Sequence, residues 1–316
     1  MSHTPALTRF IVLGITAGLL LTTPGQPLGG IPSAPAMAAA SPSAAGGRPA
    51  ANAPAVPPAP GEPAAAPYSP QLDAAPGLYV AGGQALDTVA PGSVVFNPVF
   101  GRDEVVVADP HRTALLIGDS QSSPANGWPR QALSALGYSV HFCGFGGTGF
   151  VASGRAVGNY IDALERGDWL LPAQAPALIV VEGGGNDAAQ GAADADIRTN
   201  ADRLLIALKS RFPTARIVMV GTLARGERDG GGRRTEVDAL VGDTAAAHGL
   251  EFVSVGDWLT RYNLERRLMD SVHMDDEGRR ILGNLLARRF RDMGIPDLKS
   301  PAGPAAQDRG AGRQLG

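Results

Sequence analysis

Residues 114–122 have the sequence Ala-Leu-Leu-Ile-Gly-Asp-Ser-Gln-Ser. Four consecutive apolar residues predict a strand that is buried on both faces, because a half-exposed strand would alternate apolar and polar residues. The glycine and the polar residues after the run predict a turn where the strand ends. Strands of this kind are typical of parallel sheets that helices cover on both sides, so this stretch indicates an α/β fold.

Further apolar runs alternate with helical periods along the rest of the chain. Four more strands are predicted, over residues 138–143, 178–181, 216–220 and 252–255. Helices are predicted over residues 129–136, 201–211, 237–248 and 277–293. This alternation predicts a three-layer α/β/α sandwich around a mostly parallel five-stranded sheet. Ligand sites in such sheets lie beyond the carboxyl ends of the strands, so the residues there are the first candidates for a functional site.

Polar and glycine-rich segments follow the predicted strands or precede the last helix. They occupy residues 118–122 (Gly-Asp-Ser-Gln-Ser), 144–149 (Gly-Phe-Gly-Gly-Thr-Gly), 183–187 (Gly-Gly-Gly-Asn-Asp) and 270–273 (Asp-Ser-Val-His). Together they contain the groups that acyl transfer requires. These are a serine with a histidine base, a carboxylate that orients the histidine, and amide N–H donors for an oxyanion. Any one segment alone would be an ordinary turn or helix cap.

The order of these four segments resembles the SGNH hydrolase superfamily, whose members are also called GDSL hydrolases. The resemblance covers residues 113–293 and implies a serine esterase or lipase with the flavodoxin-like fold of that superfamily. It also implies that Ser120 is the nucleophile, that His273 is the general base and that Asp270 orients the histidine. No cofactor and no metal ion are implied.

The same resemblance implies an oxyanion hole. Its donors would be the backbone N–H groups of Ser120 and Gly147 and the side-chain amide of Asn186, with Gly146 as the competing alignment for Gly147. The residue after Ser120 is Gln121, where the older motif of the family has leucine. The glycine-rich second segment is similar to that of exported actinobacterial members.

Other motifs point less well to a function. Gly144, Gly146 and Gly149 match the spacing of a dinucleotide-binding loop, but they follow the second predicted strand, whereas that motif follows the first. Residues 137–141 approach the nucleophile elbow of α/β-hydrolases, but they begin a strand and end in histidine. The histidines lack paired metal-ligand spacing. The single cysteine, Cys143, excludes an intramolecular disulfide.

Composition and the chain ends indicate export. The net charge of −3 provides no basic surface, so nucleic acid is not expected as a partner. Residues 1–40 place a positive charge before an apolar run and resemble a signal peptide, with an uncleaved anchor as the alternative. Residues 41–71 predict a Pro/Ala-rich disordered linker. Residues 72–296 are predicted to form the hydrolase domain, with a β-rich extension over 72–109, and residues 297–316 to form a disordered tail.

These observations predict a secreted or cell-envelope serine esterase. It would act as a monomer on acyl groups of envelope glycans or lipids. Two alternatives remain: an acyltransferase that uses the same residues, and a non-catalytic wall protein that binds acyl groups or glycans. An imidazole base of ordinary pKa, ~6.5, predicts activity that is lost below about pH 6.

Two further features have two interpretations each. Residues 225–234, rich in glycine and charge, form either a mobile rim over the site or an inert surface loop. Four aromatic residues either line a substrate pocket or belong to the core: Trp128, Phe145, Phe150 and Trp169.

Overall fold

The computed structural model describes residues 79–80 and 84–299 of the 316-residue chain. The predicted signal peptide and linker, residues 1–71, lie outside the described residues, as does the predicted tail from residue 300 onward. Within the described part, no helix is long and apolar enough to cross a lipid bilayer.

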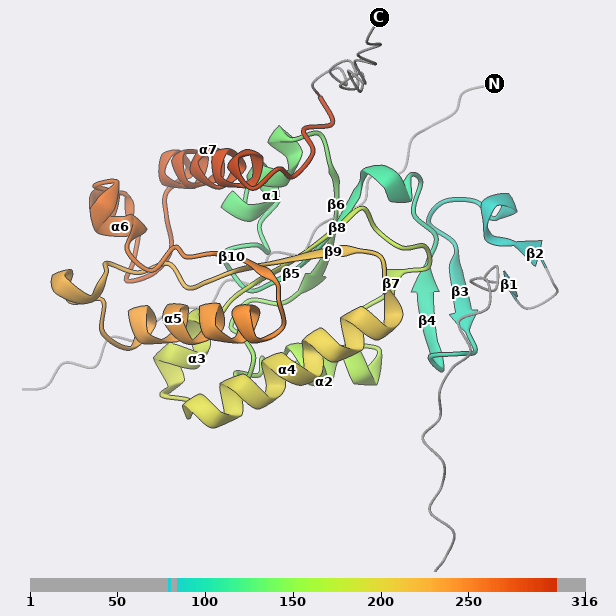
Figure 1. Ribbon diagram of the computed structural model, residues 1–316, viewed down its shortest axis with the longest axis horizontal. Coiled ribbons are helices and arrows are strands. Elements are labelled where there is room, and N and C mark those ends of the chain that lie inside the picture. The colour runs from blue at the N-terminus through green and yellow to red at the C-terminus, as the bar shows by residue number, and fades with distance from the viewer. Residues whose placement is uncertain (1–78, 81–83, 300–316) are drawn as a thin grey trace, which may run out of the picture. The chain divides into compact units, whose positions relative to one another are not determined.

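Five parallel strands form the central sheet (Figure 1). They are β5 (Thr113–Gly118), β6 (Ser139–Gly144), β8 (Leu178–Glu182), β9 (Arg216–Val220) and β10 (Glu251–Val253). Their spatial order is β10-β9-β8-β5-β6. The chain therefore adds β6 on one side of β5 and then crosses to the other side to add β8. The predicted α/β fold class is confirmed, and the ends of the five strands differ from their predicted positions by no more than two residues.

Helices cover both faces of this sheet (Figure 1). One face carries α1 (Trp128–Ala135), α6 (Trp258–Arg261) and α7 (Asp276–Asp292), and the other carries α2 (Tyr160–Arg166), α3 (Gly185–Gln190), α4 (Asp194–Arg211) and α5 (Gly232–Ala247). Successive strand residues point to opposite layers. Leu116 and Val180 pack with the first set of helices, whereas Leu115 and Val181 pack with the second. Two apolar cores result, one on each face.

Two helices begin five or more residues earlier than predicted. Helix α4 begins at Asp194, seven residues before the predicted start at residue 201, and its first turn contains two aspartates that suit the positive end of a helix. Helix α5 begins at Gly232, so the glycine-rich run that predicts a loop ends inside the first turn of this helix. Residues 232–234 are therefore helical and not part of the predicted loop over 225–234. The remainder of that segment contains the short 3₁₀ helix Glu227–Asp229.

The strands of the N-terminal extension belong to small sheets that are separate from the central sheet. Strands β3 (Val94–Asn97) and β4 (Arg102–Val105) pair antiparallel, and β7 (Leu171–Pro172) pairs with β4. Strands β1 (Tyr79–Val80) and β2 (Gln84–Ala85) form a separate antiparallel pair. The short 3₁₀ helices of this half of the chain are Leu86–Thr88 and Pro110–Arg112. The extension is thus β-rich, and it does not lengthen the central sheet.

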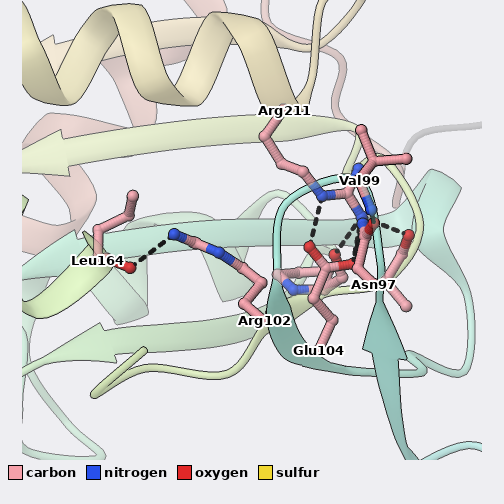
Figure 2. A network of polar contacts seen from close by, with 8 residues as sticks. Asn97, Val99, Arg102, Glu104, Leu164 and Arg211 are labelled. Atoms are coloured by element: carbon pink, nitrogen blue, oxygen red, sulfur yellow. Dashed lines mark hydrogen bonds and ion pairs between the residues drawn. The ribbon is translucent and has the colours of Figure 1, made fainter. Parts of the chain in front are cut away.

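A buried ion pair attaches the extension to the α/β core (Figure 2). Glu104, on β4, accepts two hydrogen bonds of 2.6 Å from Arg211, at the end of α4. Asn97 also donates to Glu104, at 3.0 Å. Arg211 further donates to the carbonyl oxygens of Pro172 and Ala173. The two buried charges therefore compensate each other, and further hydrogen bonds to Asn97, Pro172 and Ala173 surround the pair.

The folded region continues three residues beyond the predicted boundary at Pro296. The Leu298 N–H donates to the carbonyl oxygen of Leu136, at 2.8 Å. Asp297 forms an ion pair with Arg291 on α7, also at 2.8 Å. The predicted tail over 297–316 therefore begins too early, because these residues close over the end of α1 and α7.

Replacement of Arg211 by methionine is expected to lower the free energy of unfolding by about 3–5 kcal/mol, because Glu104 would keep a buried charge without its cationic partner. The control is Arg203→Met on the same helix. This change removes the exposed ion pair of Arg203 with Glu165 and should cost less than about 1 kcal/mol. Denaturant unfolding of the three proteins measures both values. Equal losses in the two variants would contradict this account of the extension.

Candidate active site

Ser120 lies in a tight turn directly after β5. The Asp119 carboxylate accepts the Gln121 N–H at 2.9 Å, and the Asp119 carbonyl oxygen accepts the N–H groups of Ser122 and Ser123. This turn stands where the strand order reverses, between β5 and β8. In sheets of this topology a crevice opens at that point. Ser120 itself is half-buried and lines the cavity at this point.

Ser120, His273 and Asp270 form one continuous hydrogen-bonded chain. Ser120 Oγ lies 2.9 Å from His273 Nε2, and His273 Nδ1 lies 2.7 Å from Asp270 Oδ2. The other carboxylate oxygen, Oδ1, accepts the backbone N–H groups of Val272 and His273. The carboxylate thus holds both the imidazole ring and the loop that carries it.

The environment of Asp270 determines which imidazole nitrogen carries the proton. Hydrogen bonds from the His273 ring and then from the N–H groups of His273 and Val272 hold the pKa of Asp270 well below its usual range. Asp270 is therefore an ionised carboxylate, which only accepts hydrogen bonds. Nδ1 of His273 must donate to it, and Nε2 is left to accept the proton of the Ser120 hydroxyl.

A buried carboxylate organises the glycine-rich loop after β6, residues 145–152. Asp187 on α3 is fully buried and accepts the backbone N–H groups of Phe150, Val151 and Ala152 at 2.9, 2.7 and 2.8 Å. A Cβ atom at Gly149 would collide with this carboxylate, so only glycine fits there. Asp187 therefore fixes the path of the loop that contains Gly147.

Two backbone N–H groups, one from each of two loops at this edge of the sheet, are candidate oxyanion donors. Among the described residues, neither the Ser120 N–H nor the Gly147 N–H has a hydrogen-bond acceptor. Gly147 has a φ of +84°, which turns the chain beside Ser120 and favours glycine. The adjacent Gly146 lies against the Ser120 side chain. Gly146 is thus next to the serine, and Gly147 follows it directly in the chain.

The Asn186 amide joins the first two loops. Its Nδ2 donates to Asp119 Oδ2 and to the Thr148 carbonyl oxygen, both at 2.9 Å. The predicted oxyanion donor therefore already engages both amide hydrogens within the protein. To bind an oxyanion as well, it would have to share one of them between two acceptors.

Two buried carboxyl groups, those of Asp119 within the Ser120 turn and of Glu182 in contact with it, have raised pKa values. Burial raises the pKa of Asp119 to about 6 and raises that of Glu182, at the end of β8, well above its usual range. Glu182 accepts a hydrogen bond of 2.7 Å from the Ser122 hydroxyl. The Ser120 turn is thus associated with two carboxyl groups whose charged forms are disfavoured by burial.

Gln121 connects the Ser120 turn to the loop that contains His273. Its Nε2 donates to the Val272 carbonyl oxygen at 3.0 Å, and its Oε1 accepts the indole N–H of Trp128 at 3.1 Å. A leucine at this position could make neither hydrogen bond. The departure from the older family motif therefore has a structural role here.

A cavity of about 190 Å³ opens beside Ser120. Its lining includes Asn186, Leu223, Arg234 and Val272. Of the four aromatic residues with two interpretations, only Phe145 is substantially exposed, at 44%, whereas the other three lie in the core: Trp128, Phe150 and Trp169. Within the described part of the chain, no cluster of three or more His, Cys, Asp or Glu side chains could hold a metal ion.

The structure thus brings four of the five predicted site residues together at one edge of the sheet: Ser120, Asp270, His273 and Asn186. The fifth, Gly147, directly follows Gly146, which lies against Ser120. Sequence reasoning missed Asp187, Gln121 and Arg234. The first two are adjacent to predicted site residues, and Asp187 belongs to a segment that would by itself be an ordinary turn or helix cap. Arg234 had no signal beyond its place in a charged segment.

The chain matches the sequence profile of the GDSL-like lipase/acylhydrolase family over residues 112–281. No curated protein sequence matches it. A family two carbohydrate esterase from Cellvibrio japonicus is 18% identical, with a TM-score of 0.46 over 60% of this chain and 64% of that one. A lipase/acylhydrolase from Enterococcus faecalis is 19% identical, with a TM-score of 0.44 over 58% and 96%. A carbohydrate acetylesterase from Sinorhizobium meliloti is 17% identical, with a TM-score of 0.43 over 58% and 99%.

The family match covers more than half of the 316 residues and includes the segments that contain Ser120, Asn186 and His273. The chain is therefore a hydrolase that belongs to the GDSL-like lipase/acylhydrolase family.

Proposed function

We propose that this chain is an exported serine esterase that hydrolyses carboxylic esters through a Ser-His-Asp triad. The observation that carries the proposal is the continuous chain of hydrogen bonds from Ser120 Oγ through His273 to Asp270, with lengths of 2.9 and 2.7 Å. These are the distances at which a hydroxyl transfers its proton to an imidazole base.

Acylation begins when His273 Nε2 takes the proton of the Ser120 hydroxyl as Oγ attacks the ester carbonyl carbon. The C=O π electrons move onto the carbonyl oxygen and form a tetrahedral oxyanion. Asp270 stabilises the imidazolium that forms at the same time. When the intermediate collapses, the bond to the alcohol oxygen breaks and His273 returns the proton to that oxygen. An acyl-enzyme on Ser120 and a free alcohol result.

Deacylation repeats these steps with water. His273 Nε2 removes a proton from water as its oxygen attacks the acyl carbonyl carbon. The second tetrahedral intermediate expels Ser120 Oγ, which receives the proton from His273, and the carboxylic acid leaves. Every bond and proton is accounted for by these side chains and water.

The free N–H groups of Ser120 and Gly147 are the oxyanion donors that we propose, with the Asn186 amide sharing one of its hydrogens. Backbone donors that are held in place before the reaction are effective, because no reorganisation accompanies the development of charge. The hydrogen bonds from Asp187 to the neighbouring loop supply that rigidity.

The cellular setting of the proposed esterase follows from the sequence alone. The N-terminal apolar segment and the Pro/Ala-rich stretch after it suit a protein that acts outside the cytoplasm, at the cell envelope. Acyl groups on envelope glycans or lipids are the corresponding substrates, and we propose that the protein acts on them as a monomer.

The purified protein should hydrolyse p-nitrophenyl acetate and butyrate faster than the octanoate, because the cavity beside Ser120 has a volume of only about 190 Å³. Ser120→Ala and His273→Ala should each lower kcat/KM by a factor on the order of a thousand or more. His248→Ala is the control, since His248 pairs with the carboxylate of Asp202 away from the crevice. Ester hydrolysis that persists in Ser120→Ala would refute the mechanism.

Asp187→Asn should lower kcat about tenfold or more with a smaller change in KM. The three N–H groups of the glycine-rich loop would lose a charged acceptor, and the Gly147 donor would lose its fixed position. Asp162→Asn is the control, because Asp162 lies in the first turn of α2, where its carboxylate accepts a hydrogen bond from the N-cap residue Asn159 and not from that loop. Steady-state kinetics on p-nitrophenyl acetate distinguishes the two. An unchanged kcat in a folded Asp187→Asn protein would show that the loop needs no such clamp.

A further inference from the structure

Arg234 reaches from the first turn of α5 into the cavity beside Ser120. Two backbone carbonyl oxygens orient its guanidinium group. Nε donates to the Leu223 carbonyl oxygen at 2.9 Å, and Nη1 donates to the Gly185 carbonyl oxygen at 3.2 Å. Among the described residues, Nη2 has no acceptor at all. The Nη2 edge of an oriented guanidinium is therefore available to a ligand next to the proposed oxyanion hole.

The stability of the fold does not explain why the positive charge of Arg234 lies at this position. A cation in the first turn of a helix opposes the helix dipole, and burial lowers the pKa of Arg234, although Asp119 and Glu182 partly offset that effect. The neighbouring Arg233 forms ion pairs with Asp194 and Glu236. Arg234 forms no ion pair with any residue in the described range. Unfavourable local choices of this kind are typical of functional sites.

The carboxyl groups of the same cavity do not occupy Arg234. Asp119 accepts hydrogen bonds from the Gln121 N–H and the Asn186 amide. Glu182 accepts one from the Ser122 hydroxyl at 2.7 Å, and neither carboxyl group accepts a hydrogen bond from Arg234. The guanidinium therefore faces the cavity as a positive charge without a direct counter-ion.

The volume of the cavity limits what can lie between Ser120 and Arg234. A cavity of about 150 Å³ holds a six-carbon ring. The cavity of about 190 Å³ is therefore suited to an acyl group of roughly seven non-hydrogen atoms. A succinyl group, with four carbons and three oxygens besides the ester oxygen, has that size.

We propose that Arg234 selects esters whose short acyl group ends in an oxygen acceptor, a carboxylate above all, so that the preferred substrate is a hemiester of a short dicarboxylic acid. The ester carbonyl would lie at Ser120 and the terminal carboxylate would accept from Nη2 of Arg234. Guanidinium–carboxylate hydrogen bonds are charge-assisted and gain strength away from water. This inference rests on the proposed function, since it assumes that Ser120 attacks the ester.

The test compares four benzyl esters by chromatographic detection of released benzyl alcohol. Benzyl hemisuccinate carries the carboxylate, benzyl levulinate replaces one carboxylate oxygen by a methyl group, benzyl pentanoate has no terminal acceptor, and benzyl acetate is the reference that does not reach Arg234. Relative to the acetate, kcat/KM should decrease in the order hemisuccinate, levulinate, pentanoate. We expect a preference of about tenfold or more for hemisuccinate over pentanoate.

Arg234→Met should reverse that preference, and Arg234→Lys should retain part of it, because lysine keeps the charge without the planar fork. Arg233→Met is the matched control and should keep the order of the native protein. A native protein that hydrolyses pentanoate as well as hemisuccinate would overturn the inference without any variant. An unchanged preference in folded Arg234→Met would overturn it as well.

The acetate reference separates this inference from the proposed function. Hydrolysis of benzyl acetate that depends on Ser120, without a preference for hemisuccinate, would refute only the role of Arg234. Absence of hydrolysis of all four esters, or hydrolysis that persists in Ser120→Ala, would refute the proposed function and the inference together.

Discussion

The parallel pairing of β5 with β8 is the contact on which the candidate site depends. In this register Ile117 lies opposite Val181, so the two strands end at the same edge of the sheet. The turns that follow them must then meet, and Asn186 contacts Asp119 at 2.9 Å. Because β6 was added on the opposite side of β5, the helical connections diverge here and leave the edge open. The loop that carries His273 closes the crevice from a position 153 residues further along the chain.

At this edge of the sheet, carboxylates accept backbone N–H groups of the kind that strand pairing satisfies inside the sheet. Beyond the strands the loops are rich in glycine, which is conformationally free, and their N–H groups have no neighbouring strand as partner. Asp187 accepts backbone N–H groups of the glycine-rich loop after β6, whereas Asp119 and Asp270 accept those of their own turns. Burial of such a carboxylate has an electrostatic cost, as the raised pKa of Asp119 shows. The result is a set of loops held in place while, within the described part of the chain, the N–H groups of Ser120 and Gly147 have no acceptor.

Sequence patterns predicted the strands and turns whose conformation depends on neighbouring residues in the chain. The apolar run at 114–117 predicts β5, and its position next to a Gly-Asp-Ser turn predicts where Ser120 lies. Contacts between distant residues were not predictable in this way. Gln121 contacts Val272, 151 residues away, and Asp187 contacts the glycine-rich loop about 36 residues before it. The start of α5 was missed because Gly231 and Gly232 favour a loop by local propensity, while packing of the helix on the sheet overrides that preference.

The central claim is that Ser120 is a nucleophile activated by His273, and covalent labelling tests it without any assumption about the substrate. The folded protein should react with a fluorophosphonate probe to give one adduct, which peptide mass spectrometry should locate on Ser120. Labelling should be strongly slowed in His273→Ala, because the hydroxyl would lose its base. An adduct on another residue, or a folded protein that remains unlabelled, would contradict the account.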